Sequence, residues 1–331
     1  MKKNAFIGFD GFIDQLVRPV KSRENDKIVY YSTISEFAQK LASAAGKSAD
    51  IEIITQAVKL GGNAPIMADA LGKLDVDSLC AGAMGSIGSA EYATFSQSKI
   101  SEIVSLCDPA YTYAYEFNDG KLMFADIDKI MALDYSLIRS AIGTQRLTAM
   151  MDRDLIALVN WSFLPAMHEV WSYILSEVMP ILPKKKRHIF FDIADPSKRS
   201  SDEICNVFKL MGQFVRYGNV TIGLNENEAV RAYAAISGYS SDTELTTIAL
   251  RLADYSKADS VVIHPIGYSV AASGGETVTE KGETTSNPVV TTGGGDNFNA
   301  GFCKGLLDGQ DMSACLKLGM DVGFRYVSGK F

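Results

Sequence analysis

The sequence predicts an α/β protein with a central, mostly parallel sheet and helices on both faces. Strand-like apolar runs recur at 155–161, 188–192, 220–224 and 260–264. Segments with helical spacing lie between them, near 167–179, 201–215, 226–237 and 243–257. This alternation is typical of βαβ units that form a parallel sheet. A hairpin pattern at 111–126 breaks the rhythm, which indicates a separate antiparallel element.

Composition and charge limit the function classes. The length of 331 residues allows about two domains or one large α/β domain. No internal repeat or low-complexity linker interrupts the α/β alternation, so a single domain over 1–331 is expected. The net charge of −7 argues against a nucleic-acid surface. No run of about 18 uncharged apolar residues occurs, so no membrane span is expected. Asp10 and Asp14 interrupt the first apolar run too early for a signal peptide, and the cysteines are scattered, so a cytoplasmic protein is expected.

The first strand is predicted at 4–9, and two acids follow its carboxyl end. Ligands of open α/β sheets bind outside the carboxyl ends of the strands. Asp10 and Asp14 are therefore both candidates to hold a substrate hydroxyl, and an ordinary turn acid is the alternative for either. A helix is predicted over 32–46 and a strand over 51–54.

Gly61, Gly62 and Asn63 begin the next predicted helix and leave backbone N–H groups exposed. A tight turn is the plainer interpretation of these residues. The glycines at 82, 85 and 88 lack the Gly-x-Gly spacing of a dinucleotide-binding loop. A nicotinamide-dependent oxidoreductase is therefore the last of the candidate functions.

The hairpin at 111–126 has Asn118-Asp119-Gly120 as its turn. One face of this hairpin is expected to carry the aromatic residues Tyr111, Tyr113, Tyr115, Phe117 and Phe124. An edge hairpin or a dimer surface would account for such a face.

Three glycines and an acid, Gly293–Asp296, follow a strand-like run at 289–292 and precede a predicted helix. Strand, glycine turn and helix start would make an anion site, because the first-turn N–H groups point at the anion. Asp296 would repel a phosphate unless it does chemistry or caps the helix. A base that removes a proton from a hydroxyl beside an incoming phosphoryl group fits this position. A turn with an N-cap aspartate is the alternative.

This stretch resembles the Asp-Thr-x-Gly-Ala-Gly-Asp signature of the ribokinase-like (PfkB-type) carbohydrate kinases. In that register Val290 stands for the first Asp and Gly294 for the Ala. The helix after Gly61-Gly62 resembles a second signature, Gly-Gly-x-x-x-Asn-x-Ala-x-x-Leu-x-x-Leu, with Ile66 at the Asn position. Other stretches resemble the family's Asp-Pro-Asn-x-Arg, with Ser197 for Asn, and its Asn-x-x-Glu, at 225–228.

The resemblance spans nearly the whole chain and implies a ribokinase-like fold and an ATP-dependent kinase acting on a sugar-like alcohol. Asp296 would be the general base, and the amides of Gly293, Gly294 and Gly295 would stabilise the transition state. Mg²⁺ would bridge the ATP phosphates near Glu228, held through water. The substrate would contact Asp10, Asp14, Gly61, Gly62 and Asn63, and the nucleotide Asn225, Thr291 and Gly267. Asn225 and Glu228 could equally form a helix-capping pair.

The resemblance also implies a small β lid over the sugar, built from segments at about 15–31 and 110–127. Such a lid would exclude water from the reacting phosphoryl group. It could also pair two copies of the chain as a homodimer.

Alternatives to a sugar kinase stay open at this point. A nucleoside kinase of the same fold is favoured slightly by the apolar Ile66. A catalytically weak sugar-binding or regulatory protein on this fold would account for Val290, Ile66 and Ser197.

Overall fold

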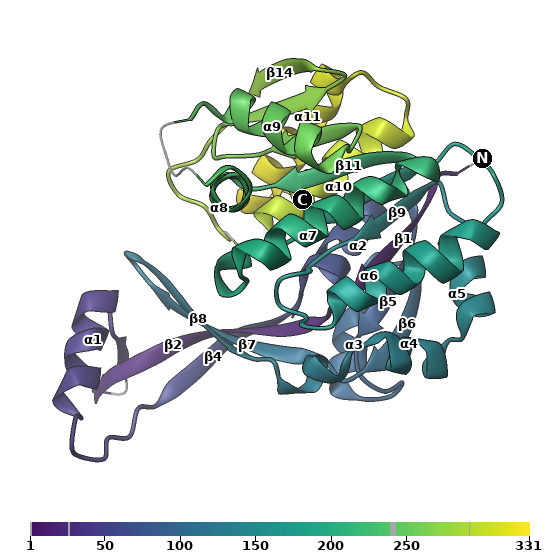
Figure 1. Ribbon diagram of the computed structural model, residues 1–331. Coiled ribbons are helices and arrows are strands. Elements are labelled where there is room, and N and C mark those ends of the chain that lie inside the picture. The colour runs from purple at the N-terminus through teal and green to yellow at the C-terminus, as the bar shows by residue number, and fades with distance from the viewer. Residues whose placement is uncertain (1, 26, 239–242, 291) are drawn as a thin grey trace.

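The computed structural model describes residues 2–25, 27–238, 243–290 and 292–331, and these form a large sheet wrapped in helices and a smaller sheet that projects from it (Figure 1). Thr291, one of the predicted nucleotide contacts, lies outside the described residues. In the described part of the chain, the larger sheet has nine strands in the order β14-β13-β12-β11-β10-β9-β1-β5-β6. Its pairs from β6 to β12 are parallel, and β13 and β14 add an antiparallel edge.

The strands of the larger sheet are β1 (Asn4–Phe9), β5 (Asp77–Ala83), β6 (Glu102–Cys107), β9 (Leu155–Leu158), β10 (His188–Asp192), β11 (Asn219–Leu224), β12 (Ser260–Ile263), β13 (Tyr268–Ser273) and β14 (Glu276–Lys281). The smaller sheet contains β2 (Phe12–Glu24), β3 (Lys27–Tyr30), β4 (Ile53–Gly61), β7 (Ala110–Phe117) and β8 (Gly120–Asp126).

The helices are α1 (Ile34–Ser43), α2 (Asn63–Lys73), α3 (Ala90–Ser96), α4 (Tyr135–Ala141), α5 (Thr144–Met151), α6 (Met167–Tyr173), α7 (Ser201–Gly212), α8 (Glu226–Ser237), α9 (Leu245–Ser256), α10 (Gly294–Leu307) and α11 (Met312–Val327). The apolar pattern predicted one helix over 167–179, but α6 passes into a π-helical turn, Ile174–Val178. Among the described residues, no helix combines the length and apolarity needed to cross a membrane.

Strand alternation divides the core of the larger sheet into two layers. In β10, Ile189 and Phe191 face the layer that contains residues of α6, α7 and α9, whereas Phe190 faces the layer of α2, α10 and α11. Successive side chains of a strand point to opposite faces, so a strand buried on both sides is a continuous apolar run. The predicted α/β architecture, a mostly parallel sheet with helices on both faces and a separate small sheet, is confirmed.

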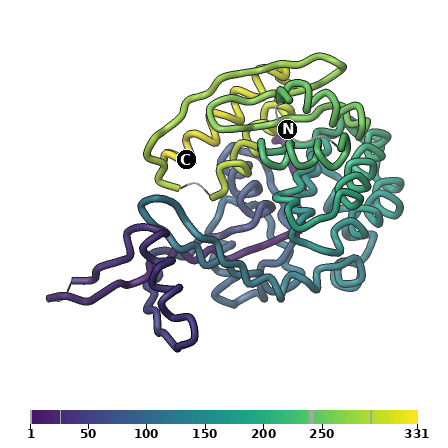
Figure 2. Tube along the Cα trace, turned by 60° about the vertical axis from the view of Figure 1, so that its left-hand side comes forward, coloured from purple at the N-terminus to yellow at the C-terminus, as the bar shows by residue number. Residues whose placement is uncertain are grey.

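The predicted lid segments, at about 15–31 and 110–127, account for only part of the smaller sheet. The predicted strand at 51–54 lies at the start of β4, and β4 pairs along β2 in this sheet. Strand β2 also pairs in parallel with β7, and β7 pairs antiparallel with β8 (Figure 2). Helix α1 covers its outer face, where Phe37 contacts the rings of Tyr115 and Phe117.

The strand predicted at 289–292 is wrong where the structure describes it. Val289 lies in a bend and Val290 in coil, and both backbone N–H groups donate to the carbonyl of Val327 at the end of α11. The side chain of Val289 is 74% exposed. Their β-branched side chains favour a strand, but neither residue pairs with a strand in the described part of the chain.

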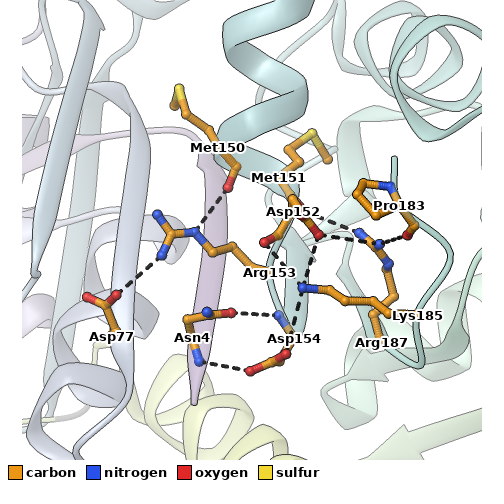
Figure 3. Close-up of polar contacts among 10 residues, drawn as sticks. All are labelled: Asn4, Asp77, Met150, Met151, Asp152, Arg153, Asp154, Pro183, Lys185 and Arg187. Atoms are coloured by element: carbon orange, nitrogen blue, oxygen red, sulfur yellow. Dashed lines mark hydrogen bonds and ion pairs between the residues drawn. The ribbon is translucent and has the colours of Figure 1, made fainter. Parts of the chain in front are cut away.

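A network of ion pairs and hydrogen bonds joins segments at the amino-terminal edge of the larger sheet, opposite its carboxyl edge (Figure 3). The guanidinium of Arg187, only 2% exposed, donates to the carbonyls of Pro183 and Met151 and pairs with Asp152 at 3.6 Å. Asn4 and Asp154 exchange hydrogen bonds beside it and so join β1 to β9. This network lies at the end of the sheet away from the ligand-binding edge.

Candidate active site

A cavity of about 590 Å³ lies between the carboxyl edge of the larger sheet and the inner face of the smaller sheet. Its polar lining comes from several elements that are distant in sequence: Asp14 of β2, Asn63 of α2, Thr112 of β7, Asn160 after β9 and Asp296 of α10. Apolar side chains form much of the rest, among them Phe12, Ile66, Met123 and Phe163. We call this space the first cavity.

Of the two acids after β1, only Asp14 lines the first cavity. The buried Asp10 carboxylate accepts hydrogen bonds from the backbone N–H groups of Asn63 (2.8 Å) and Ala64 (2.7 Å), and from the Asn160 side-chain amide (2.6 Å). Burial raises the pKa of Asp10 to about 6, although these three hydrogen bonds act to lower it. Asp10 therefore holds the first turn of α2 and orients Asn160.

Gly61 and Gly62 allow this close packing. Gly62 has φ of 90°, and a side chain at either position would meet a carboxylate: Asp14 at Gly61 and Asp10 at Gly62. Only Gly62 lines the first cavity. Burial raises the pKa of Asp14, which a hydrogen bond from Thr112 and the charges of Lys121 and Lys59 oppose.

A second cavity, of about 380 Å³, lies on the other side of the first turn of α10. Gly294 and Gly295 line it together with Asn225, Gly267 and Phe298. Gly293, the N-cap residue of α10, has φ of 88°, a conformation that glycine adopts without strain. Free N–H groups at a helix N-terminus attract anions, so this cavity suits a phosphate chain.

Asp296 stands between the two cavities, in the first turn of α10. The Asn63 side-chain amide donates to its Oδ1 at 2.9 Å. Burial raises the pKa of Asp296 well above its usual range, and the charges of Asp192 and Asp10 raise it further. The hydrogen bond from Asn63 acts in the opposite direction. A carboxylate with a raised pKa is a stronger proton acceptor than a free aspartate.

Asn225 and Glu228 form a full capping box at the start of α8. The Asn225 side chain accepts from the Glu228 N–H at 2.9 Å, and the Glu228 carboxylate accepts from the Asn225 N–H at 2.9 Å. Burial raises the pKa of Glu228 well above its usual range, and the nearby Asp192 charge adds to this. The helix-capping interpretation is therefore confirmed, and it places a buried carboxylate beside the second cavity.

Asp192, at the end of β10, is a buried acid that sequence patterns did not assign to the site. Its oxygens accept from the N–H of Ala194 at 2.7 Å and from the Asn299 side-chain amide at 2.8 Å. Burial raises its pKa to about 6. The Asn299 Oδ1 is buried with no hydrogen-bond partner. Among the described residues no three His, Cys, Asp or Glu side chains are grouped as metal ligands, so Asp192 and Glu228 would act on a cation only through its water shell.

Sequence patterns also did not predict Asn160 and Thr112 as residues of the site. Asn160 belonged to the predicted strand at 155–161, but β9 ends at Leu158, so Asn160 lies at a strand's carboxyl end. Thr112 pairs with Asp14 across β2 and β7. The rule that ligands bind beyond strand ends would have found Asn160, whereas Thr112 required the strand register.

Arg199 is partly buried and has a structural role, which includes an ion pair with Glu203, although it lines the first cavity. Its guanidinium donates to the backbone carbonyls of Trp161, Ser162 and Leu164, and it lies over the Trp161 ring at 4.6 Å. Lys198 is an exposed cation at the rim of the same cavity. Carboxylates of Asp14, Asp195 and Asp296 offset these cations, so the cavity has no excess positive charge for an anionic substrate.

Comparison with known proteins identifies the family. A family model described as prokaryotic ketohexokinase matches residues 2–330, almost the whole chain. The chain belongs to this family. It is a carbohydrate kinase, as the resemblance implied. A ketohexokinase of Haloferax volcanii is 28% identical over 313 residues, which cover 90% of this chain and 80% of that protein.

Solved structures agree on the fold. A ribokinase from Thermotoga maritima has a TM-score of 0.65 at 13% identity, over 99% of this chain and 93% of that one. An Arabidopsis thaliana ribokinase, solved with ribose and ATP, has a TM-score of 0.68 at 14% identity, with the same shares covered. An adenosine kinase from Sinorhizobium meliloti has a TM-score of 0.65 at 14% identity, over 98% of this chain and 93% of that one.

Proposed function

We propose that this carbohydrate kinase transfers the γ-phosphoryl group of ATP to a hydroxyl of a ketohexose, with Asp296 as general base. The observation that carries the proposal is the position of Asp296, which lines the first cavity from the helix turn whose Gly294 and Gly295 line the second. A sugar in the first cavity and a nucleotide in the second would meet at this turn. We propose further that residues 1–331 act as one domain, with the smaller sheet as the lid.

The first cavity suits an uncharged polyol. Asp14, Asn63 and Asn160 offer acceptors and donors for hydroxyl groups, while Phe12 and Phe163 offer rings for the C–H faces of a sugar. Its acids and bases are nearly balanced, so a neutral sugar fits better than a sugar phosphate. The ketohexokinase of Haloferax volcanii supports a ketohexose as the acceptor.

The chemistry follows from the residues around Asp296. Asp296 would accept the proton of the attacking hydroxyl, and the N–H groups of the first α10 turn would stabilise charge on the phosphoryl oxygens. Asn63 would hold the Asp296 carboxylate in place through its hydrogen bond. Glu228 and Asp192 would hold Mg²⁺ through water, and Asn225 would order the same water shell. Bound Mg²⁺ would neutralise charge on the ATP phosphates.

A nucleoside kinase is the second candidate, because the apolar Ile66 lines the first cavity where a sugar-binding amide would be expected. The test measures the rate at which phosphorylated product forms from each acceptor in the presence of ATP and Mg²⁺. The acceptors are fructose, other ketoses, aldoses, fructose 1-phosphate and adenosine. Turnover of a ketohexose at least tenfold above every other acceptor supports the proposal. Preference for adenosine would replace it with the nucleoside kinase, and preference for a sugar phosphate would contradict the argument from charge.

A further inference from the structure

The lid carries one lysine toward the anion-binding turn. Residues of one strand alternate between the faces of a sheet, so Lys121, Met123 and Ala125 of β8 share one face. Met123 and Ala125 line the first cavity, which makes this the inner face of the lid. Lys121 lies next to the tip of the hairpin, beyond both of them.

The Lys121 side chain reaches from the lid to the loop before α10. Its Nζ donates to the hydroxyl of Thr292, a residue 171 positions away in the sequence. Thr292 lines the first cavity and immediately precedes Gly293, the N-cap of α10. The Tyr326 hydroxyl donates to the Thr292 carbonyl at 3.1 Å, which fixes the loop from the other side.

Lys121 carries its charge at this place without an ion-pair partner. Of the ion pairs formed within the described part of the chain, none includes Lys121. Its side chain is half-buried, and burial lowers its pKa, while the charges of Glu116 and Asp14 act in the opposite direction. The Thr292 hydroxyl is neutral, and the carboxylates of Glu116 and Asp14 act on the ammonium only from beyond ion-pair distance. A cation without a direct ion pair beside a helix N-terminus is able to bind an anion.

We propose that Lys121 is a lid-borne catalytic cation that binds the phosphoryl group during its transfer from ATP to the sugar. The proposal rests on the proposed function and deepens it. A bond forms between the sugar oxygen and phosphorus while the bond from phosphorus to the leaving ADP oxygen breaks. The hydroxyl proton passes to Asp296, and Lys121 keeps its protons throughout. Its charge offsets the negative charge on the equatorial phosphoryl oxygens.

This arrangement links lid closure to catalysis. The lid brings a cation to the loop directly before the α10 amides, so both positive groups can act on the phosphoryl group only when the lid lies over the cavity. The Thr292 hydroxyl would be the resting partner of the ammonium and would be exchanged for a phosphoryl oxygen.

The test compares Lys121→Met, which keeps the length of the side chain and removes its charge, with Lys121→Arg and Thr292→Val. Lys27→Met, an exposed lysine of β3, is the matched control. Lys121→Met is expected to lower kcat by about 10²-fold with KM for sugar and ATP changed less than about threefold, as for loss of one transition-state donor. Lys121→Arg should recover at least tenfold of this loss. Lys27→Met should stay within about threefold of the wild-type kcat, and Thr292→Val should lose much less kcat than Lys121→Met.

A second readout does not depend on turnover. Lys121→Met should lose most of the extra affinity that Mg²⁺ and tetrafluoroaluminate add to ADP binding in calorimetry, and it should keep its affinity for ADP alone. Equal affinity of the two proteins for the ADP–fluoride complex would overturn the proposal. So would a Thr292→Val defect as large as that of Lys121→Met, because Lys121 would then act only by fastening the lid. Failure of every acceptor in the wild type would instead refute the proposed function.

Discussion

The crowded carboxylates of the site should make the protein less stable as the pH rises, and Asp192→Asn should relieve this. Asp192 is 5% exposed, and burial raises its pKa from 3.8 to about 6. Between about pH 4 and pH 6 the unfolded chain has released this proton and the folded chain still holds it. The folded state binds more protons in this window, so the free energy of unfolding falls as the pH rises through it.

The size of the effect follows from these pKa values. The difference between 3.8 and about 6 corresponds to about 3 kcal/mol at neutral pH. Asparagine keeps the shape but weakens the hydrogen bonds from Ala194 and Asn299, which offsets about 1–2 kcal/mol. We therefore expect a net gain of about 1–2 kcal/mol at pH 7.5, which raises Tm by about 1–3 °C. At pH 4.5 the ionisation penalty of Asp192 has fallen to about 1 kcal/mol, so the variant should melt at the wild-type temperature or slightly below it.

The assay is thermal unfolding at pH 4.5, 5.5, 6.5 and 7.5, without nucleotide or Mg²⁺. Asp50→Asn, which changes the same charge at an exposed position outside the site, is the control and should leave Tm unchanged. The reasoning is refuted if Asp192→Asn lowers Tm at pH 7.5, or if its effect on Tm is the same at pH 4.5 and 7.5.

Three further substitutions test separate parts of the site and fold. Asn63→Ala removes a hydrogen bond that lowers the pKa of Asp296, so the acid limb of the kcat/KM profile should move to higher pH; an unmoved limb contradicts this. Arg187→Met removes the donor to the Pro183 carbonyl, whereas Asp152 keeps its ion pair with Lys185 and the Met151 carbonyl keeps the Arg153 N–H. Urea melts should therefore show a loss of about 1–3 kcal/mol with unchanged substrate affinities; a loss below about 0.5 kcal/mol would count against it. Glu228→Gln should raise the Mg²⁺ concentration for half-maximal activity by about tenfold or more at constant sugar KM, and an unchanged Mg²⁺ dependence would exclude this role.

Much of the fold could be predicted because local pattern and tertiary structure agree. Helix α8 over Glu226–Ser237 and strand β10 over His188–Asp192 follow the predicted bounds, since amphipathic spacing and caps specify them locally. Val289 and Val290 show the limit. Their side chains favour a strand, but strand formation needs a neighbouring edge, and residue type carries no information about that edge.

Side-chain roles at the site were harder to predict than its location. The carboxyl end of β1 is at the site, but Asp10 points into the first turn of α2 and Asp14 into the cavity, and this depends on the path of β2. The Lys121–Thr292 contact joins residues 171 positions apart. Contacts of this kind require the folded arrangement of the lid over α10, which sequence spacing cannot supply.

Asp296 is proposed to accept the proton of a sugar hydroxyl during phosphoryl transfer. The most direct measurement is single-turnover transfer from ATP to the preferred ketohexose by the wild type and Asp296→Asn, with sugar and nucleotide affinities measured in parallel. We expect a transfer rate lower by about 10²-fold or more in the variant, as for loss of a general base, with both affinities nearly unchanged. Transfer by Asp296→Asn within about fivefold of the wild-type rate would contradict it.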